Sequence, residues 1–286
     1  MSKINGRTIA LLILALVLYV SAFFTASEPM DFEAVLPFGS PKFLNALFGA
    51  TTLSYILSVV FLILTAVSIY SFNMMYTTGI NYLLPVLYIF LALYNQRAIF
   101  FSPLHIVALL LIWSLAFSAK YRDAVQNLSD NYLSFFLFGT ASLFFPPLVW
   151  IFPLITLVNY RASEEKFKYV FTSLLGLFTP LVMVSAICYI FGGKELLSSL
   201  GASFWSSMST LGRYGLDFTT VEIVALLVII TFALISTFHV LRNLNRYKII
   251  HSNTSIRIIF FAILITLVFA VFITDNHDPY GVVLFV

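Results

Sequence analysis

The chain alternates between long apolar runs and short polar stretches. Seven runs come close to the roughly 20 apolar residues that a helix needs to cross a bilayer. They cover residues 8–24, 52–72, 80–94, 103–118, 170–191, 221–241 and 256–273. The pattern predicts that each of these runs is a transmembrane helix.

The segment between the fourth and fifth runs, residues 132–160, is apolar but contains Pro146 and Pro147. Two adjacent prolines remove two backbone donors and break an α-helix. We therefore expect two short half-spans that form a hairpin and return to the side on which the segment began.

Basic residues test this topology, because cytoplasmic loops collect Lys and Arg. With the N-terminus in the cytoplasm and the hairpin returning to its starting side, 11 of the 15 basic residues fall on the inner side. The outer side receives Lys42, Arg97, Lys194 and Arg213, together with eight of the 12 acidic residues. The distribution predicts about nine crossings.

Composition agrees with a membrane protein. Hydrophobic residues make up 61% of the chain and charged residues 9%, against about 45–50% and about 25% in soluble proteins. No segment is polar enough to fold alone in water, so we expect one membrane-embedded, all-α domain, residues 1–286, with the lipid bilayer as its main partner. A net charge of +3 without a basic cluster excludes nucleic-acid binding.

Two segments of the outer loops have helical periodicity. In residues 194–215 the apolar positions recur every three or four residues, and serines fill much of the other face; these apolar positions are Leu197, Leu200, Phe204, Met208 and Leu211. Residues 42–49 repeat the pattern more briefly. Both predict helices that lie in the membrane interface, although helices that only seal the bundle are an alternative.

Ionisable groups mark ion pathways when they lie inside a membrane. Every Asp, Glu, Lys and Arg of this chain falls in a loop or at the end of a predicted span. This distribution disfavours an ion-coupled pump, while leaving open a path for an uncharged substrate lined by Ser, Thr and Tyr. It places any chemistry at an interface.

The outer interface has an acidic stretch at residues 26–41, directly after the first predicted span, with Glu28, Asp31 and Glu33 within six positions. Three interpretations stay open: ordinary acidic bias of an outer loop, a divalent cation bound by carboxylate oxygens, or a general base whose pKa is raised near an apolar surface.

Other kinds of site have little support. The four histidines, His105, His239, His251 and His277, show no zinc-binding spacing. There is no Walker loop or dinucleotide fingerprint, and the single Cys188 lies in an apolar run and is interpreted as a small buried hydrophobe. Beyond the open alternative of a cation at the acidic stretch, the sequence predicts no metal site, and it identifies no cofactor.

Residues 130–192 resemble an uncharacterised family of bacterial inner-membrane proteins, which implies architecture and location but no activity. More distantly, a pattern of small residues followed by prolines is similar to the multi-spanning C-type glycosyltransferases; it comprises Gly139, Ala141, Ser142, Pro146 and Pro147. Those enzymes take sugar from polyprenyl-phosphate donors at the outer leaflet and carry acidic residues, often Asp-x-Glu-like, in the first outer loop. Asp31-Phe32-Glu33 stands at that place. The chain is shorter than most such enzymes and lacks their large soluble domain.

We therefore expect a multi-pass protein of the bacterial inner membrane that is a glycosyltransferase-like enzyme, or its accessory subunit, acting on polyprenyl-phosphate-linked sugar. Asp31 or Glu33 would be the base or metal ligand, and Arg97 and Arg213 would bind phosphate, since guanidinium groups offer it paired donors. The alternative is a non-enzymatic membrane scaffold or assembly subunit, in which the acidic residues are solvated and the interfacial helices form a docking surface.

Overall fold

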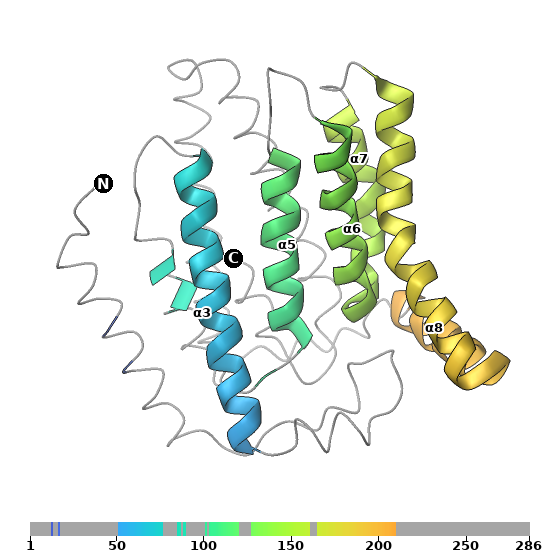
Figure 1. The fold of residues 1–286 in the computed structure, drawn as a ribbon, viewed down its shortest axis with the longest axis horizontal. Helices are drawn as coiled ribbons and strands as arrows, with labels where there is room; N and C mark the ends of the chain where they lie inside the picture. The colour runs from blue at the N-terminus through green and yellow to red at the C-terminus, as the bar shows by residue number, and fades with distance from the viewer. Residues whose placement is uncertain are drawn as a thin grey trace, which may run out of the picture.

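The computed structural model describes residues 51–76, 101, 103–119, 127–160 and 165–209, together with Ile13, Val17, Pro85, Val86, Tyr88 and Ile89. The elements in the long ranges are all helical (Figure 1): α3 (Thr51–Tyr76), α5 (Pro103–Ala119), α6 (Leu128–Phe144), the 3-10 helix η3 (Pro146–Ile151), α7 (Phe152–Tyr160) and α8 (Lys166–Ser209). The predicted all-helical architecture is confirmed for these residues.

α3 and α5 run side by side in the same direction. The Phe101 backbone N–H donates to Ser54 Oγ at 3.0 Å, and the Trp113 indole donates to Ser68 Oγ at 3.1 Å, so residue numbers rise together along both helices. Two parallel neighbours require a returning segment between them. Residues 80–94 were expected to provide it, and the described part of that range is helical and largely buried: Pro85, Val86, Tyr88 and Ile89.

α6 runs opposite to α5 (Figure 1). The Ser114 and Ser134 hydroxyls each donate to the other residue's backbone carbonyl at 2.8 Å, and both residues lie one to two turns from the segment that links the helices. Asn127 begins α6 as its N-cap, because its side chain accepts from the Ser129 N–H at 3.2 Å.

The proline pair interrupts the helix, as predicted. α6 ends at Phe144, Phe145 leaves the helical region with φ −137° and ψ 84°, and Pro146 and Pro147 open η3. α7 then leads back toward the start of α6 (Figure 1), where α8 begins. The hairpin is unequal: a 17-residue helix descends, and a six-residue and a nine-residue helix return.

α8 packs against α6 in parallel and very closely. A Cβ on Gly139 would meet the Leu177 carbonyl oxygen at 2.5 Å, and a Cβ on Gly176 would meet the Tyr132 carbonyl oxygen at 2.7 Å. Only a residue without a side chain permits this approach of two helix backbones. The hairpin and α8 therefore form one packed unit.

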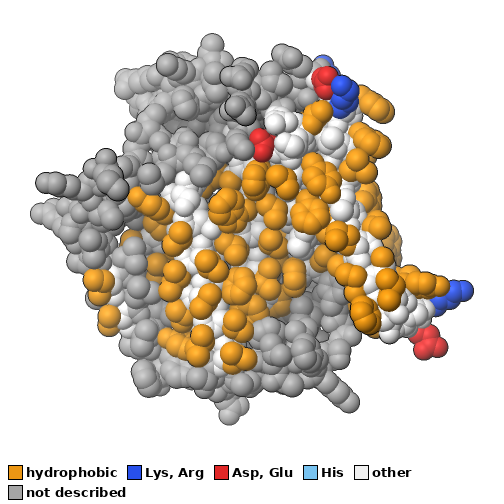
Figure 2. Space-filling view, viewed as in Figure 1, with side chains coloured by type: hydrophobic (Ala, Val, Ile, Leu, Met, Phe, Trp, Pro, Cys, Tyr) orange, Lys and Arg blue, Asp and Glu red, His pale blue; other side chains and the backbone are white. Residues whose placement is uncertain are grey.

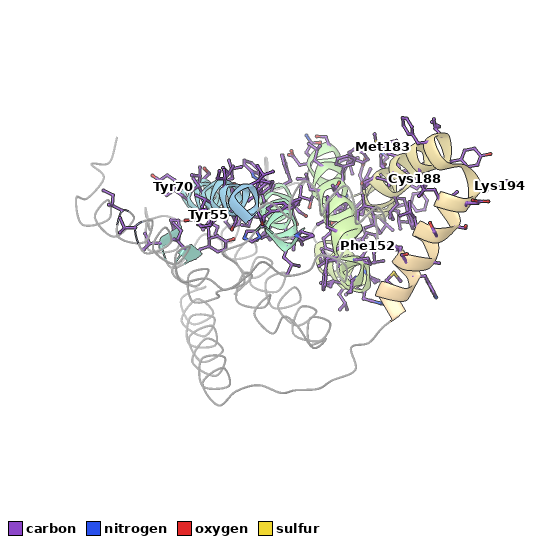
Figure 3. The ribbon with its side chains drawn as sticks, turned by 90° about the horizontal axis from the view of Figure 1, so that it is seen from below. Tyr55, Tyr70, Phe152, Met183, Cys188 and Lys194 are labelled. Atoms are coloured by element: carbon purple, nitrogen blue, oxygen red, sulfur yellow. The ribbon has the colours of Figure 1, made fainter. Side chains whose placement is uncertain are left out.

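α8 consists of two helical arms that meet at Gly193, whose φ of 62° and ψ of −158° are non-helical. The first arm, residues 166–192, contains the span expected at residues 170–191. The second arm, residues 194–209, is the described part of the helix expected at residues 194–215. Seen from below (Figure 3), the second arm is viewed from its side and runs away from the first at the corner marked by Lys194.

The surface of the described bundle is more apolar than that of a water-soluble protein, and its core contains polar side chains among the apolar ones. Large apolar side chains are exposed along α3 and the first arm of α8, and they include Ile56, Val60, Val67, Phe178, Val182 and Ile187. Hydroxyl and amide side chains are buried between the helices, among them Ser54, Ser58, Ser114, Asn131, Ser134 and Ser173. In Figure 2 the charged side chains of the described residues lie toward two opposite ends, with an apolar surface between them.

Within the described residues, two helical segments are long and apolar enough to cross a membrane by length and composition: Leu53–Phe72 and Lys166–Trp205, the second of which includes the Gly193 corner. Pro103–Ala119 and Pro146–Leu157 are apolar but shorter. The other expected elements, residues 8–24, 42–49, 221–241 and 256–273, lie outside the described residues or have only isolated residues there.

Candidate functional site

The four residues to which the sequence assigned a role, Asp31, Glu33, Arg97 and Arg213, all lie outside the described residues. Their proposed roles stay predictions. The described helices instead contain two buried polar clusters, one at each end of the bundle, that were not identified from the sequence.

The first cluster joins the beginnings of α3 and α5. His105 has an exposed fraction of 0%, and its Nε2 lies 3.3 Å from Ser58 Oγ. One turn earlier on α3, Ser54 Oγ accepts from the Phe101 N–H, and the Phe101 ring stacks on the imidazole with centroids 6.0 Å apart. This part of the structure is the end of the bundle at which the first arm of α8 also ends (Figure 1).

A serine oxygen beside an imidazole nitrogen has the composition of a nucleophile and its base. Which partner donates depends on the imidazole tautomer. Both side chains are completely buried between α3 and α5, so no substrate reaches them in this conformation. The contact holds the two helices in register, and it places an imidazole near the end of the bundle where the sequence predicts the outer loops.

The second cluster joins α6 to α8 at the opposite end. The Asn131 amide nitrogen lies 3.1 Å from the Tyr169 carbonyl oxygen, 2.8 Å from Thr172 Oγ1 and 3.0 Å from Ser173 Oγ. Asn131 Oδ1 is buried without a hydrogen-bond partner. Because an amide carries two N–H groups, it shares them among three acceptors, and this cluster fixes the rotation of α6 against α8.

The charged residues near this second cluster differ in exposure. Asp130 is buried at the start of α6, whereas Glu165 and Lys168 are exposed at the start of α8 and form an ion pair at 2.8 Å. An exposed pair of this kind contributes at most about 1 kcal/mol. The ion pair serves here as a marker of position, because the apolar surface of the first arm begins at its level.

The described ranges contain no group of three His, Cys, Asp or Glu side chains that could hold a metal ion. Cys188 is half-buried on the first arm of α8, not fully buried as its sequence context suggested. Two apolar residues nearby on the same arm, Ile187 and Phe191, are exposed.

Sequence reasoning missed His105 because it looked for metal-binding spacing along the chain. Its partner Ser58 is 47 residues away. A usable signal was the serine spacing on α3: Ser54 and Ser58 are one turn apart and share a helix face, which indicates a polar stripe that needs partners inside an apolar bundle.

No family model matches the chain, and no curated protein or solved structure matches it either.

Proposed function

We propose that this chain is a multi-pass protein of the bacterial inner membrane, with about nine crossings and a cytoplasmic N-terminus. The observation that carries membrane placement is the apolar exposed surface of the described bundle. Its hydroxyl, amide and imidazole groups are inside, and its exposed helix faces are apolar. Water would penalise this surface, whereas lipid chains match it.

The lengths agree with this placement. The first arm of α8 has no charged residue between Lys168 and Lys194, a stretch of 25 residues, 169–193. At 1.5 Å per helical residue this stretch reaches about 37 Å, somewhat more than the hydrocarbon core of about 30 Å. One tilted helix of this length spans a bilayer.

The relative directions of the helices also agree with the proposed topology. It requires α3 and α5 to run from the outer side inward, α6 to start inside, and the first arm of α8 to run outward. The helices have these relative directions (Figure 1). The end that holds His105 and the Gly193 corner is then the outer end.

For the activity, we propose a glycosyltransferase-like enzyme or accessory subunit that uses polyprenyl-phosphate-linked sugar at this outer end. Arg97 stands four residues before Phe101, and four residues of chain reach at most about 14 Å. Phe101 is fastened to Ser54 beside the His105 cluster. This reach supports the proposal that Arg97 binds phosphate at the same end of the bundle as the buried imidazole.

The test uses the full chain in lipid vesicles with a photoreactive polyprenyl phosphate as the probe. Arg97→Ala and Arg213→Ala should lower crosslinking to the chain, because each removes paired donors for phosphate. Lys42→Gln removes an outer positive charge to which no role is assigned and should crosslink like the wild type. Equal crosslinking by all three variants would contradict the phosphate site.

Catalysis is tested separately. Asp31→Asn and Glu33→Gln keep shape but remove the charge of a base or metal ligand, and loss of a general base costs about 100-fold to 10,000-fold in rate. Both should leave probe crosslinking intact, and the variant of the residue that acts as base or metal ligand should fail to restore a deletion strain. If both restore it as well as Lys42→Gln does, the non-enzymatic scaffold becomes the better description.

A further inference from the structure

The second arm of α8 is an amphipathic helix whose two sides differ in exposure. Where its burial is described, most half-buried positions are apolar and recur at helical spacing; they include Leu197, Leu200, Phe204 and Met208, and Ser203 is the polar exception. Its exposed positions are small or polar, with one indole among them: Ser198, Ser199, Gly201, Ala202 and Trp205. The apolar side therefore faces the bundle, and Trp205 lies at the flank between the two sides.

Three serine hydroxyls on this arm donate within the helix itself. Ser198 and Ser199 donate to carbonyl oxygens three residues earlier at 2.9 Å, and Ser203 donates to the carbonyl four residues earlier at 2.8 Å. These donors need no protein partner outside the helix. The exposed side can therefore lie in a region of mixed polarity.

The corner at Gly193 fixes the depth of the arm. Its φ and ψ lie in a region that only glycine adopts without strain, and Lys194 and Glu195 follow at once, both exposed. The first arm uses its charge-free length of about 37 Å to cross a hydrocarbon core of about 30 Å. The corner therefore falls at the boundary between acyl chains and headgroups.

Two exposed tryptophans belong to the second arm and to the segment that it contacts. The Trp150 indole on η3 donates from Nε1 to the Met208 carbonyl oxygen at 3.1 Å, which fastens the far end of the arm to the hairpin. Trp150 is 54% exposed and Trp205 is 65% exposed. An indole with an apolar ring and a polar N–H prefers the membrane interface.

We propose that the second arm is a membrane-interface anchor, and that the lipid headgroup and upper acyl region of one leaflet cover its exposed side, with Trp150 and Trp205 as the two anchoring side chains. This inference rests on the proposed membrane placement. The corner at Gly193 converts a crossing helix into one that lies on the end of the bundle, and the Trp150 contact keeps it there.

Tryptophan quenching tests the depth directly, because the chain has three tryptophans. Three full-chain variants each retain one of them, with phenylalanine at the other two positions. Each is reconstituted in phosphatidylcholine vesicles whose acyl chains carry bromine either near the headgroup or near the methyl end. Trp113 is the internal control: it lies ten residues into α5, about 15 Å from that helix's start, and so near the bilayer centre.

Trp150 and Trp205 should be quenched more by the shallow bromines, at about 10–15 Å from the bilayer centre. Trp113 should be quenched more by the deep bromines. If neither lipid quenches Trp113, the membrane placement itself is wrong. If Trp113 is deep but Trp205 responds only to aqueous iodide, the arm lies in water; if Trp205 responds to neither lipid nor iodide, a second chain covers it. Either of these two results overturns the anchor.

A backbone variant, made in the chain that retains Trp205 as its single tryptophan, is a second test of the corner. Gly193→Ala disfavours the corner and should shift Trp205 quenching away from the shallow value. Gly201→Ala lies on the same arm, where a Cβ would meet nothing within 4 Å, and should leave the quenching unchanged. Identical profiles for the two variants would show that the corner does not position the arm.

Discussion

Replacing Gly139 by alanine tests the closest approach in the bundle. The added Cβ would lie 2.5 Å from the Leu177 carbonyl oxygen, 0.9 Å short of the 3.4 Å at which ordinary contact begins, and 2.9 Å from Pro180 Cγ. The first obstacle is backbone, so no rotamer change relieves it. α6 and α8 must move apart by most of 1 Å.

Overpacking of this kind lowers the free energy of unfolding by about 1–3 kcal/mol. Gly→Ala within a helix raises it by up to about 1 kcal/mol through helix propensity. Gly201→Ala receives the propensity gain without the clash, because the space around Gly201 is open. Because both variants receive the propensity gain, the free energy of unfolding should differ between them by the cost of the clash, about 1–3 kcal/mol. Gly176→Ala, whose Cβ would meet the Tyr132 carbonyl oxygen at 2.7 Å, should resemble Gly139→Ala.

The assay is reversible unfolding by sodium dodecyl sulfate in mixed micelles, followed by circular dichroism and tryptophan fluorescence. Separation of α6 from α8 should also lengthen the Asn131 contacts with Thr172 and Ser173, which are 2.8 and 3.0 Å. If Gly139→Ala and Gly176→Ala unfold at the same detergent fraction as Gly201→Ala, the close helix contact is not present in the protein.

Three further predictions concern other parts of the fold. Asn131→Asp should destabilise the protein more than Asn131→Ala in the same unfolding assay. It replaces the buried amide donor, 3.1 Å from the Tyr169 carbonyl oxygen, by an acceptor. Equal losses of stability would contradict the donor role. Replacing Pro146 and Pro147 by leucine should favour one continuous span and change the labelling of a cysteine placed at residue 165 in a Cys188→Ala background; unchanged labelling would oppose the hairpin. A reporter active only in the cytoplasm should work when fused after Lys248 and fail after Arg213, and the reverse result would overturn the proposed sidedness.

Local features of the fold could be predicted from the sequence. The helix break at Pro146 follows from the missing backbone donors, and the apolar face of the second arm follows from periodicity at Leu197, Leu200 and Phe204. Each depends on residues within a few turns of one another. The charge-free length between Lys168 and Lys194 also sufficed to predict a span there.

Contacts between distant helices could not be predicted in the same way. The approach at Gly139 depends on which helix lies opposite and in which register, and Pro180, which also borders it, reads from the sequence only as a helix breaker. The pairing of His105 with Ser58 depends on the parallel packing of α3 and α5. The candidate catalytic and phosphate-binding residues, Asp31, Glu33, Arg97 and Arg213, stay predictions because they lie outside the described residues.

The buried hydroxyls bear on the alternative of a path for an uncharged substrate through the bundle. Thr65 and Ser68 on α3 donate to carbonyl oxygens one turn earlier, both at 2.7 Å, and Thr140 on α6 and Thr156 on α7 do the same at 2.8 Å. A hydroxyl bonded to its own helix needs no water to satisfy its donor, so it can be buried against a neighbouring helix at little cost.

The polar interior of the described bundle therefore does not require a hydrated channel. The hydroxyls of Thr65, Ser68, Thr140 and Thr156 donate to the backbone. Polar contacts between side chains, such as the Trp113 indole on Ser68 Oγ at 3.1 Å, join helix to helix. A substrate would have to displace packing contacts to pass between these helices. The described helices thus favour a packed helical frame over a conduit, and on the proposed function they direct the search for chemistry to the end of the bundle that holds His105 and the Gly193 corner.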